Sequence, residues 1–588
     1  MEKLAALRKL MSEQGIAAYV IPSGDAHNTE YVAPYWSARK WFSGFTGSAG
    51  LAVVTHSIAG VWADGRYFIQ AEKELAGTDL TLFKMNEPDV PTYEEFLYKQ
   101  LKPGDTVAFD GRSMSMEAFH DLKEILEPKN IKYAYEADLV GDIWLDRPPL
   151  PTGLAFEHPP AFARLSATEK LAQVREKMAA EGVDYYLVTS LTDIAWLLNI
   201  RGNDIPYLPV IYAYVLITEK DATIFVSPDK ITDISAKLEA QGFRLDQYEN
   251  IANAVKALPS EGVIHYTQKK TNMLLAEAIP QGVTHKTDMD NIISHLKGVK
   301  SDKELENIRN AYTKEGVAMV KLLAWLDQGV AAGETITEDD VAKKLTALRT
   351  TQPHAIGDSF CTISAYGPNA ALPHYRHEGT GATIKPEGFF LLDTGGQYLD
   401  GTTDTTRTMA MGPLTQEMKN DYTYVLKGHL AVNNAIFPPK TTGVAIDALA
   451  RQPVLQSQQN YNHGTGHGIG YCLGVHEGPH GVSSRSTLDF APGMLISNEP
   501  GIYKAGRHGI RIENVLAVQV LCTNDFGTFH HFENLTLCPY DTQGINPDLL
   551  TPEEITCLNN YHAKVYEVLA PLLTQDEQDW LAAATAAL

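Results

Sequence analysis

The sequence contains little cysteine and none of the spacings that give cysteine a structural role. Five cysteines occur in 588 residues, and no two of them form a CxxC pair. An odd and irregularly spaced set excludes a disulfide framework and gives no thiolate zinc site. The cysteines are Cys361, Cys472, Cys522, Cys538 and Cys557. Their number and spacing predict a protein of the reducing cytoplasm.

Long apolar runs and excess positive charge are also missing. The first residues, MEKLAALRKLMSEQGIAAYV, are charged and amphipathic, and no run approaches the roughly 18 apolar residues of a membrane span. The formal net charge is −23 and the pI is about 5.3. Phosphates would be repelled, which argues against a nucleic acid or an anionic membrane as a partner. We therefore expect a cytoplasmic globular protein.

A weak repeat runs through the first half of the chain. Glu2–Ala5 reads EKLA and recurs at Glu169–Ala172, an offset of 167 residues. In each copy an amphipathic helix reaches a glycine and then enters a buried strand, over 17–21 in the first copy and 185–188 in the second. We interpret the repeat as a duplicated α/β module; chance similarity of two helix-to-strand units is the alternative.

Prolines and a helix cap divide the chain. The proline-rich segment Arg147–Pro151 is typical of a linker. Ser301 followed by Glu304 predicts a capping box that opens a long helix through Trp325. The predicted domains are 1–155, 156–298 and 299–588, the last with a polar helical extension from about 547. The fold class is α/β (α+β).

Two aspartates in the third domain lie on the two arms of one predicted hairpin. Phe389–Asp393 is a buried strand that ends in a carboxylate, and after Thr394–Gly396 the chain returns as Gly401–Thr406. In a hairpin, Asp393 and Asp404 would face each other at about 5 Å between Cβ atoms, where they repel unless a cation lies between them. Taken alone, either aspartate fits a turn or cap role better.

Two glutamates follow other strands of the same domain. Glu499 comes after the predicted strand 494–497, and Pro500 favours extended geometry at Glu499 before a turn. In the segment IRIE, alternation buries the isoleucines and puts Arg511 and Glu513 on the opposite face. One acid at a strand end is ordinarily solvated, but four acids beside apolar strands of one domain point to a shared site.

Histidines complete the set. The loop His463–Gly470 reads HGTGHGIG, and His476 follows within HEGP. The HxxxH spacing would place His463 and His467 on one helix face, but four glycines prevent a stable helix. A glycine loop lets backbone approach a ligand closely, so only one of these rings need touch metal. Taken alone, such a loop is more often a structural turn.

Together these residues predict a hydrolytic metal site. Two aspartates, one histidine and two glutamates offer hard oxygen ligands and one imidazole, which suits Mn²⁺, Co²⁺ or Zn²⁺ in a two-metal cluster. The two cations would balance the four carboxylates, whereas the same cluster without metal would be a costly accumulation of buried negative charge.

The order and local motifs of these five residues resemble the metallopeptidase family with the pita-bread fold, which includes methionine aminopeptidases, prolidases and aminopeptidase P. The strongest likeness is to the three-domain cytosolic type of aminopeptidase P (Xaa-Pro aminopeptidase), and it covers nearly the whole chain. Outside the site, the likeness rests on Pro22–His27, Ser43–Gly50, Asp64–Tyr67 and Asp193–Gly202.

The resemblance implies two creatinase-like N-terminal α/β modules followed by a pita-bread catalytic domain. The metal ligands it implies are Asp393, Asp404, His467, Glu499 and Glu513. The catalytic residues it implies are His374, His463, His476, Glu499 and Arg511, of which Arg511 matches an arginine that braces a metal-bound aspartate.

The same resemblance implies the reaction and the partners. A hydroxide bridging two divalent metal ions, Mn²⁺ first with Co²⁺ or Zn²⁺ as alternatives, would release the N-terminal residue from peptides with proline second. Glu499 would carry the proton, and the protein would be a homodimer. A prolidase restricted to dipeptides is the first rival, and a non-catalytic binding module of the same fold is a rival from another class.

Two N-terminal motifs receive structural interpretations. The glycine-rich segment Gly44–Gly50 lacks the Lys-Ser/Thr that follows a P-loop, so we interpret it as a turn. Asp64-Gly65 predicts a hairpin turn, and no role follows for Arg66.

Overall fold

The computed structural model describes residues 2–377 and 379–588, which form two compact units. The first unit comprises Met1–His158 and Leu165–Ile293, and the second comprises Pro159–Arg164 and Ser294–Leu588. All five cysteines are free thiols. Over the described parts of the chain, every helix is too short or too polar to span a bilayer.

The first unit begins with a six-stranded mixed sheet of order β4-β3-β2-β1-β5-β6. β1 pairs antiparallel with β2 and parallel with β5, while β3–β4 and β5–β6 are parallel. The strands are β1 Ala18–Ile21, β2 Leu51–Thr55, β3 Ala59–Ala63, β4 Thr81–Lys84, β5 Thr106–Ala108 and β6 Lys132–Ala134. The helices are α1 Glu2–Glu13, α2 Ala38–Ser43, α3 Phe68–Leu75, α4 Tyr93–Gln100, α5 Met116–Leu126 and α6 Leu139–Ile143.

A second six-stranded sheet, of order β12-β11-β10-β8-β13-β14, has the same topology. Its central strand β8 is likewise antiparallel to one neighbour and parallel to the other, and both outer pairs are parallel. The strands are β8 Tyr185–Val188, β10 Ala213–Thr218, β11 Ala222–Val226, β12 Arg244–Asp246, β13 Val263–His265 and β14 Thr284–Lys286, with the short β7 Phe156–Glu157 and β9 Ile200–Arg201 pairing separately. The shared topology supports the proposal of a duplicated module.

The helices around this second sheet are α7 Ala167–Ala180, α8 Leu191–Leu198, α9 Ser235–Ala240, α10 Ile251–Lys256 and α11 Met273–Glu277; α12 Ile292–Gly298 follows it. Local chemistry explains the helix starts in both modules. Leu4, Leu7 and Met11 form the buried stripe of α1, which is the amphipathic helix of the first repeat copy. Ser166 and Glu169 form a capping box at the start of α7, which satisfies backbone donors of its first turn.

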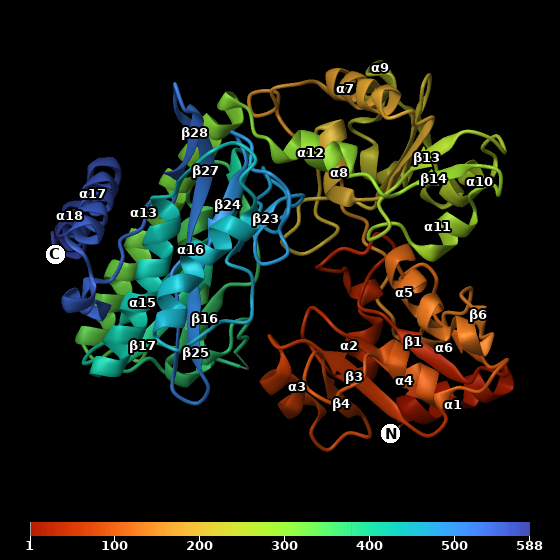
Figure 1. Ribbon diagram of the computed structural model, residues 1–588, viewed down its shortest axis with the longest axis horizontal. Coiled ribbons are helices and arrows are strands. Elements are labelled where there is room, and N and C mark those ends of the chain that lie inside the picture. The colour runs from red at the N-terminus through yellow and green to blue at the C-terminus, as the bar shows by residue number, and fades with distance from the viewer. Residues whose placement is uncertain (1, 378) are drawn as a thin grey trace. The chain divides into compact units, whose positions relative to one another are not determined.

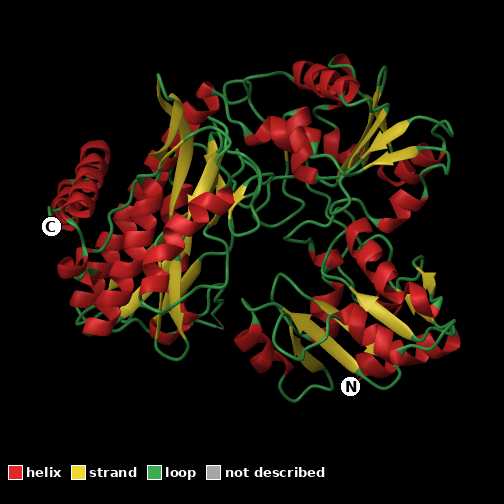
Figure 2. Ribbon diagram, viewed as in Figure 1, coloured by secondary structure: helices red, strands yellow, loops and turns green. Residues whose placement is uncertain are grey.

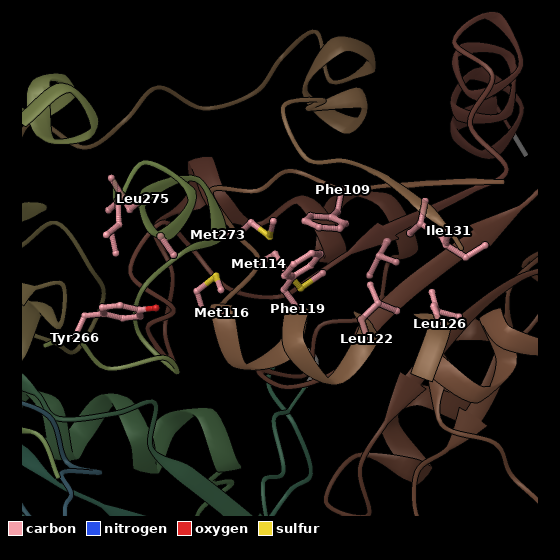
Figure 3. Close-up of a cluster of buried hydrophobic side chains, with 14 of the residues drawn as sticks. Phe109, Met114, Met116, Phe119, Leu122, Leu126, Ile131, Tyr266, Met273 and Leu275 are labelled. Carbon is pink, nitrogen blue, oxygen red and sulfur yellow. The ribbon is translucent and has the colours of Figure 1, made fainter. Parts of the chain in front are cut away.

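An apolar cluster joins the two modules of the first unit. Phe109 and Phe119 of the first module lie in one cluster with Tyr266, Met273 and Leu275 of the second (Figure 3). Buried aromatic and aliphatic area of this kind is the main source of stability in a domain.

Polar contacts cross the same junction. The imidazole of His27 contacts the Thr189 carbonyl oxygen through Nδ1 at 2.7 Å and the Tyr248 hydroxyl through Nε2 at 2.9 Å. The Tyr212 hydroxyl donates to Asp25 at 2.8 Å. The motif Pro22–His27 therefore supplies a buried link within the first unit.

One prediction in this unit is wrong. Asp64-Gly65 does not turn a hairpin, because β3 is followed by a turn in which the Tyr67 N–H donates to the Asp64 carbonyl, and α3 begins at Phe68. The Asp64 carboxylate accepts from the backbone N–H and the guanidinium of Arg66, so the side chain closes this turn.

The second unit combines long helices with short strands, and in Figure 2 its helices stand beside the strands. The predicted capping box of Ser301 and Glu304 is present, and α13 Asp302–Ala331 continues beyond the predicted end at Trp325. Its other helices are α14 Glu338–Thr350, α15 Gln416–Asn433, α16 Gly443–Gln456, α17 Pro552–Leu569 and α18 Gln575–Ala584 (Figure 1).

The strands of the second unit carry the predicted site. They are β15 Ala355–Asp358, β16 Ile363–Tyr366, β17 Phe389–Thr394, β18 Gly396–Tyr398, β19 Gly401–Thr402, β20 Thr405–Ala410, β21 Ile436–Phe437, β22 Gly466–His467, β23 Gly481–Val482, β24 Leu495–Asn498, β25 Gly501–Lys504, β26 His508–Arg511, β27 Asn514–Asn524 and β28 Gly527–Asn534. They form small sheets of orders β16-β17-β20, β15-β18-β19 and β21-β28-β27-β24, and the pairs β22-β23 and β25-β26.

Candidate metal centre

Asp393 lies on β17 and Asp404 lies next to the start of β20, in a register that differs from the predicted one. β17 pairs antiparallel with β20, but Asp393 lies opposite Thr406, and Asp404 comes just before β20 begins. The intervening residues form β18 and β19, which pair with each other. The return strand is therefore as predicted, and the direct pairing of the two aspartates is wrong.

Close backbone approach explains the glycines that break β17. A Cβ on Gly395 would lie 1.9 Å from the Thr403 carbonyl oxygen. No side chain fits at that distance, so the strand can turn away here only with glycine. Because the chain returns so closely, the segment before Asp404 runs beside the end of β17.

The two glutamates enter from two further strands. Glu499 follows β24, and its N–H donates to the Thr465 carbonyl at 2.8 Å. Glu513 lies between β26 and β27, and its carboxylate accepts from the Thr406 hydroxyl at 2.6 Å. Glu513 is thereby held against the strand that begins next to Asp404.

The histidine loop has no helix, as its glycines predict. Gly466 and His467 form β22, which pairs with β23. A Cβ on Gly466 would lie 1.9 Å from the Ser497 carbonyl oxygen, and the Ser497 hydroxyl accepts from the His467 N–H at 3.0 Å. Glycine therefore lets the loop lie directly on β24, which precedes Glu499.

These elements bring three predicted ligands into one group. Asp404, His467 and Glu513 each offer a ligand atom, and the three atoms lie within 4.8 Å of one another. His467 Nε2 lies 3.5 Å from Asp404 Oδ2 and 3.5 Å from Glu499 Oε1. Asp393 Oδ1 and Glu513 Oε1 are buried and have no hydrogen-bond partner. Unpaired carboxylate oxygens in a buried cluster are the donors that a divalent cation requires.

The electrostatics of the cluster show how strongly its carboxyl groups interact. Burial raises the pKa of Asp404 well above its usual value, and the charges of Glu513, Asp393 and Glu499 add to the effect. Burial likewise raises the pKa of Glu499 and, together with Asp393, raises that of Glu513 to about 7. Ionising this cluster therefore needs compensating positive charge.

Arg511 connects the cluster to two of the other predicted histidines. Its Nη2 donates to Asp393 Oδ2 in a buried ion pair and lies 3.4 Å from the carbonyl oxygen of Pro373, the residue before His374. Its Nη1 donates to the Tyr503 hydroxyl at 2.9 Å, and that hydroxyl lies 2.8 Å from His463 Nε2.

His476 lies beside His467, the histidine that is predicted to bind metal. The rings of His467 and His476 meet edge to face with centroids 4.3 Å apart. His476 is exposed whereas the next residue, Glu477, is buried. His476 thus lies at the protein surface next to a buried residue.

Sequence reasoning missed two residues of this site. Thr406 holds Glu513, and Tyr503 links Arg511 with His463. Tyr503 does carry a signal, because it lies on the same face of β25 as Gly501, which pairs with Arg511. A Cβ on Gly501 would lie 2.6 Å from the Tyr503 hydroxyl, so the glycine leaves room for this contact.

Family comparisons account for most of the chain. Residues 306–520 match the model of metallopeptidase family M24, and residues 528–588 match the C-terminal region of peptidase M24. Residues 3–137 and 146–304 match two models that are both described as a creatinase/prolidase N-terminal domain.

Two relatives match nearly the whole chain. A probable Xaa-Pro aminopeptidase P of Laccaria bicolor is 39% identical over 99% of the chain and 92% of the relative. Aminopeptidase P2 of Arabidopsis thaliana is 38% identical over 99% of the chain and 87% of the relative.

Solved structures agree on the fold. The X-prolyl aminopeptidase of Caenorhabditis elegans, described as a cytosolic enzyme with a di-nuclear active site, has a TM-score of 0.95 and 33% identity, covering 100% of this chain and 99% of its own. An Xaa-Pro dipeptidase of Bacillus anthracis, with a TM-score of 0.51 and 25% identity, covers 64% of this chain and 99% of its own. The predicted fold class, creatinase-like modules before a pita-bread domain, is confirmed.

Proposed function

The chain belongs to the Xaa-Pro aminopeptidase P family of the M24 metallopeptidases, and from this premise we propose that it removes the N-terminal residue from peptides with proline in the second position. The observation that carries the proposal is the group of Asp404, His467 and Glu513, whose ligand atoms lie within 4.8 Å of one another. The names of the relatives supply the substrate class.

The residues fit a pair of divalent cations. Buried, unpaired oxygens of Asp393 and Glu513 face no protein donor, and several interacting carboxyl groups need positive charge. The ligands we propose are Asp393, Asp404, His467, Glu499 and Glu513. Oxygen donors with one imidazole favour Mn²⁺, with Co²⁺ or Zn²⁺ as alternatives. Bound there, two such ions would act as Lewis acids and lower the pKa of a shared water.

Side chains of the protein supply the proton transfers. We assign Glu499 to accept the proton of the attacking water and to deliver it to the prolyl nitrogen as the C–N bond breaks. The water oxygen ends on the carbonyl carbon of the released residue, and the prolyl nitrogen leaves as a secondary amine that takes its second proton from the new carboxyl group. The backbone hydrogen bond from Glu499 to Thr465 fixes the position of Glu499 beside His467.

The other predicted residues orient the substrate and the ligands. His476 is exposed beside His467, so its imidazole can donate to the oxyanion that develops on the scissile carbonyl. We assign His374 and His463 to positioning of the peptide, and Arg511 to orientation of Asp393. Proline has no N–H to recognise, so selection must depend on ring shape and on the trans isomer.

The domain plan favours this activity over a dipeptidase. The Bacillus anthracis dipeptidase covers 64% of the chain, whereas the Caenorhabditis elegans aminopeptidase covers all of it. We propose two N-terminal modules, 1–155 and 156–298, before a catalytic domain from 299 whose helical extension starts near 547. We also propose a cytoplasmic location and a homodimer; the Caenorhabditis elegans relative is described as cytosolic.

A matched set of peptides tests the proposal. Protein stripped of metal and reloaded with Mn²⁺ is given Arg-Pro-Pro-Gly-Phe, Arg-Ala-Pro-Gly-Phe and the dipeptide Arg-Pro. Release of arginine from the first pentapeptide alone or in clear preference, and its loss in Glu499→Gln, supports the assignment. Cleavage of the dipeptide alone would make the protein a prolidase, and no cleavage would favour a binding module.

A further inference from the structure

A buried ion pair lies directly behind the strands that carry the two aspartates. Arg349 of α14 donates to Glu315 of α13 through Nη2 at 2.6 Å and through Nε at 3.0 Å. The side chains are 0% and 2% exposed, so the pair has no access to solvent. Burial alone would raise the pKa of Glu315, but the Arg349 guanidinium outweighs it, so the pKa lies below its ordinary value.

Arg349 contacts the residue that follows Asp393 and packs against a glycine that is bonded to the residue before Asp404. Arg349 Nη2 donates to the hydroxyl of Thr394, the residue after Asp393, at 2.9 Å. The ion pair reaches Thr403, the residue before Asp404, through the backbone of Gly396, which packs against Arg349.

Strand geometry gives this contact a direction. Successive side chains of a strand point to opposite faces, so a Thr394 side chain held toward Arg349 turns Asp393 toward the other face. Gly396, two residues after Thr394, lets the chain lie close to Arg349. A Cβ on Gly396 would lie 2.7 Å from Arg349 Cδ, so a side chain would push the two apart. The hydroxyl of Thr403 also accepts from the Gly396 N–H at 2.8 Å.

Two further contacts fix the ion pair itself. The Tyr398 hydroxyl donates to Glu315 Oε2 at 2.7 Å, and Arg349 Nη1 forms an ion pair with Asp358. A buried ion pair costs desolvation, and apolar residues of equal volume often stabilise a fold as well or better. Stability alone therefore does not account for this network, whereas the orientation of the two neighbouring aspartates does.

We propose that Glu315 and Arg349 are positioning residues for the metal centre, acting through Thr394 and Thr403 to set the spacing of Asp393 and Asp404. This inference rests on the proposed ligand roles of the two aspartates. The pair does not touch metal or substrate. Its loss should weaken Mn²⁺ binding and alter the coordination geometry while the rest of the domain stays folded.

The test measures metal binding directly. Titration of stripped full-length protein with Mn²⁺, followed by calorimetry, gives the affinity and the number of ions bound. The absorption spectrum of the Co²⁺-loaded protein reports the ligand geometry. We expect Arg349→Met and the isosteric Glu315→Gln each to weaken binding of at least one ion by tenfold or more and to change the Co²⁺ spectrum. Arg349→Lys keeps the charge but not the two parallel hydrogen bonds, so we expect it to recover part of the affinity.

Two control variants separate positioning from stability. Arg309→Met removes a two-bond ion pair with Glu533 from the surface of the same helix α13. Leu569→Ala removes a fully buried side chain from a cluster that the C-terminal helices share with Val317 and Val320 of α13, and it should lower the melting temperature. Both should keep the affinity and the Co²⁺ spectrum of the unchanged protein.

The outcomes also separate this inference from the proposed function. If the unchanged protein binds no Mn²⁺, the proposed function fails first. If it binds two ions and Glu315→Gln and Arg349→Met bind them equally tightly with the same spectrum, the positioning role is refuted. A loss of affinity in Leu569→Ala equal to that in Arg349→Met would refute it as well, since destabilisation alone would then explain the effect.

Discussion

The imidazole of His476 meets the imidazole of His467 edge to face, with an angle of 85° between the ring planes and centroids 4.3 Å apart. The backbone beside them is tied together as well, because the Glu477 N–H donates to the Gly468 carbonyl at 2.8 Å. Glu477 is itself buried against Lys297 at 2.9 Å and Lys300 at 3.1 Å. The geometry thus holds an exposed histidine at a fixed place beside a proposed metal ligand.

His476→Ala should lower kcat and leave the metal content unchanged. A donor aimed at a developing oxyanion contributes on the order of 100- to 1,000-fold in kcat, and a loss of that size is expected here. Steady-state kinetics with an Xaa-Pro peptide, together with elemental analysis of bound metal, measure both properties. His56→Ala, which removes an exposed histidine of the first unit, is the control. Loss of metal from His476→Ala would instead make His476 a ligand.

Arg511→Met should destabilise the protein and reduce activity. The substitution leaves the buried Asp393 without its cationic partner, and breaking a buried ion pair in this way costs about 3–5 kcal/mol. Urea unfolding of the metal-free protein measures the change in free energy of unfolding. Arg507→Met is the matched control, since Arg507 lies on the same hairpin but pairs with Glu417 at the surface. Equal effects of the two substitutions would argue against the role of Arg511.

Metal removal should lower both activity and thermal stability. Ions that bind only the folded state stabilise it by about 2.7 kcal/mol at a concentration 100 times the dissociation constant. Without them the carboxyl groups of Asp404, Glu499 and Glu513 repel one another. A chelator should therefore lower the melting temperature, and Mn²⁺ should restore it. An unchanged melting temperature after verified metal removal would contradict the account.

His27 should make the first unit sensitive to acid. Burial lowers the pKa of His27 from 6.5 to about 4, so at pH values between these the unfolded chain binds the extra proton. Stability contributed by neutral His27 is complete above about pH 6.5 and is lost as the pH falls toward 4, at up to about 1.4 kcal/mol per pH unit. The titratable groups around the ring are Asp25, Tyr212, Tyr214, Tyr248 and Lys270.

Urea unfolding of the full chain at several pH values measures this effect. Between about pH 4 and pH 6.5, His27→Gln should reduce the dependence of the free energy of unfolding on pH. The reduction should correspond to at most one proton fewer taken up on unfolding. An identical slope in both proteins would show that His27 does not contribute.

Local patterns predicted the elements of the site better than its register. The strand ending at Asp393 and the capping box at Ser301 follow from residues close in sequence, and both are present. Asp393 pairs with Thr406 rather than Asp404 because the chain forms β18 and β19 between β17 and β20. The close packing around Gly395 and Gly396 that accompanies these strands is tertiary and is not visible in the local sequence. The hairpin predicted at Asp64-Gly65 was wrong for a related reason. The same dipeptide can lead into a strand or into a helix, and its local sequence does not decide between them.

Side-chain contacts between residues far apart in the sequence could not be predicted from it. Glu315 and Arg349 are 34 positions apart on two helices, where a charged residue ordinarily lies at the surface. Thr406 is one of several threonines in its strand, and only the fold reveals that its hydroxyl holds Glu513.

The most direct test titrates Mn²⁺ into stripped protein while following release of arginine from Arg-Pro-Pro-Gly-Phe, with bound metal counted at each point. The account predicts that activity appears with the metal and reaches its maximum at two ions per chain, and that Asp404→Asn lowers the number bound. A maximum at one ion, or arginine release that persists without metal, would contradict a dinuclear Xaa-Pro aminopeptidase.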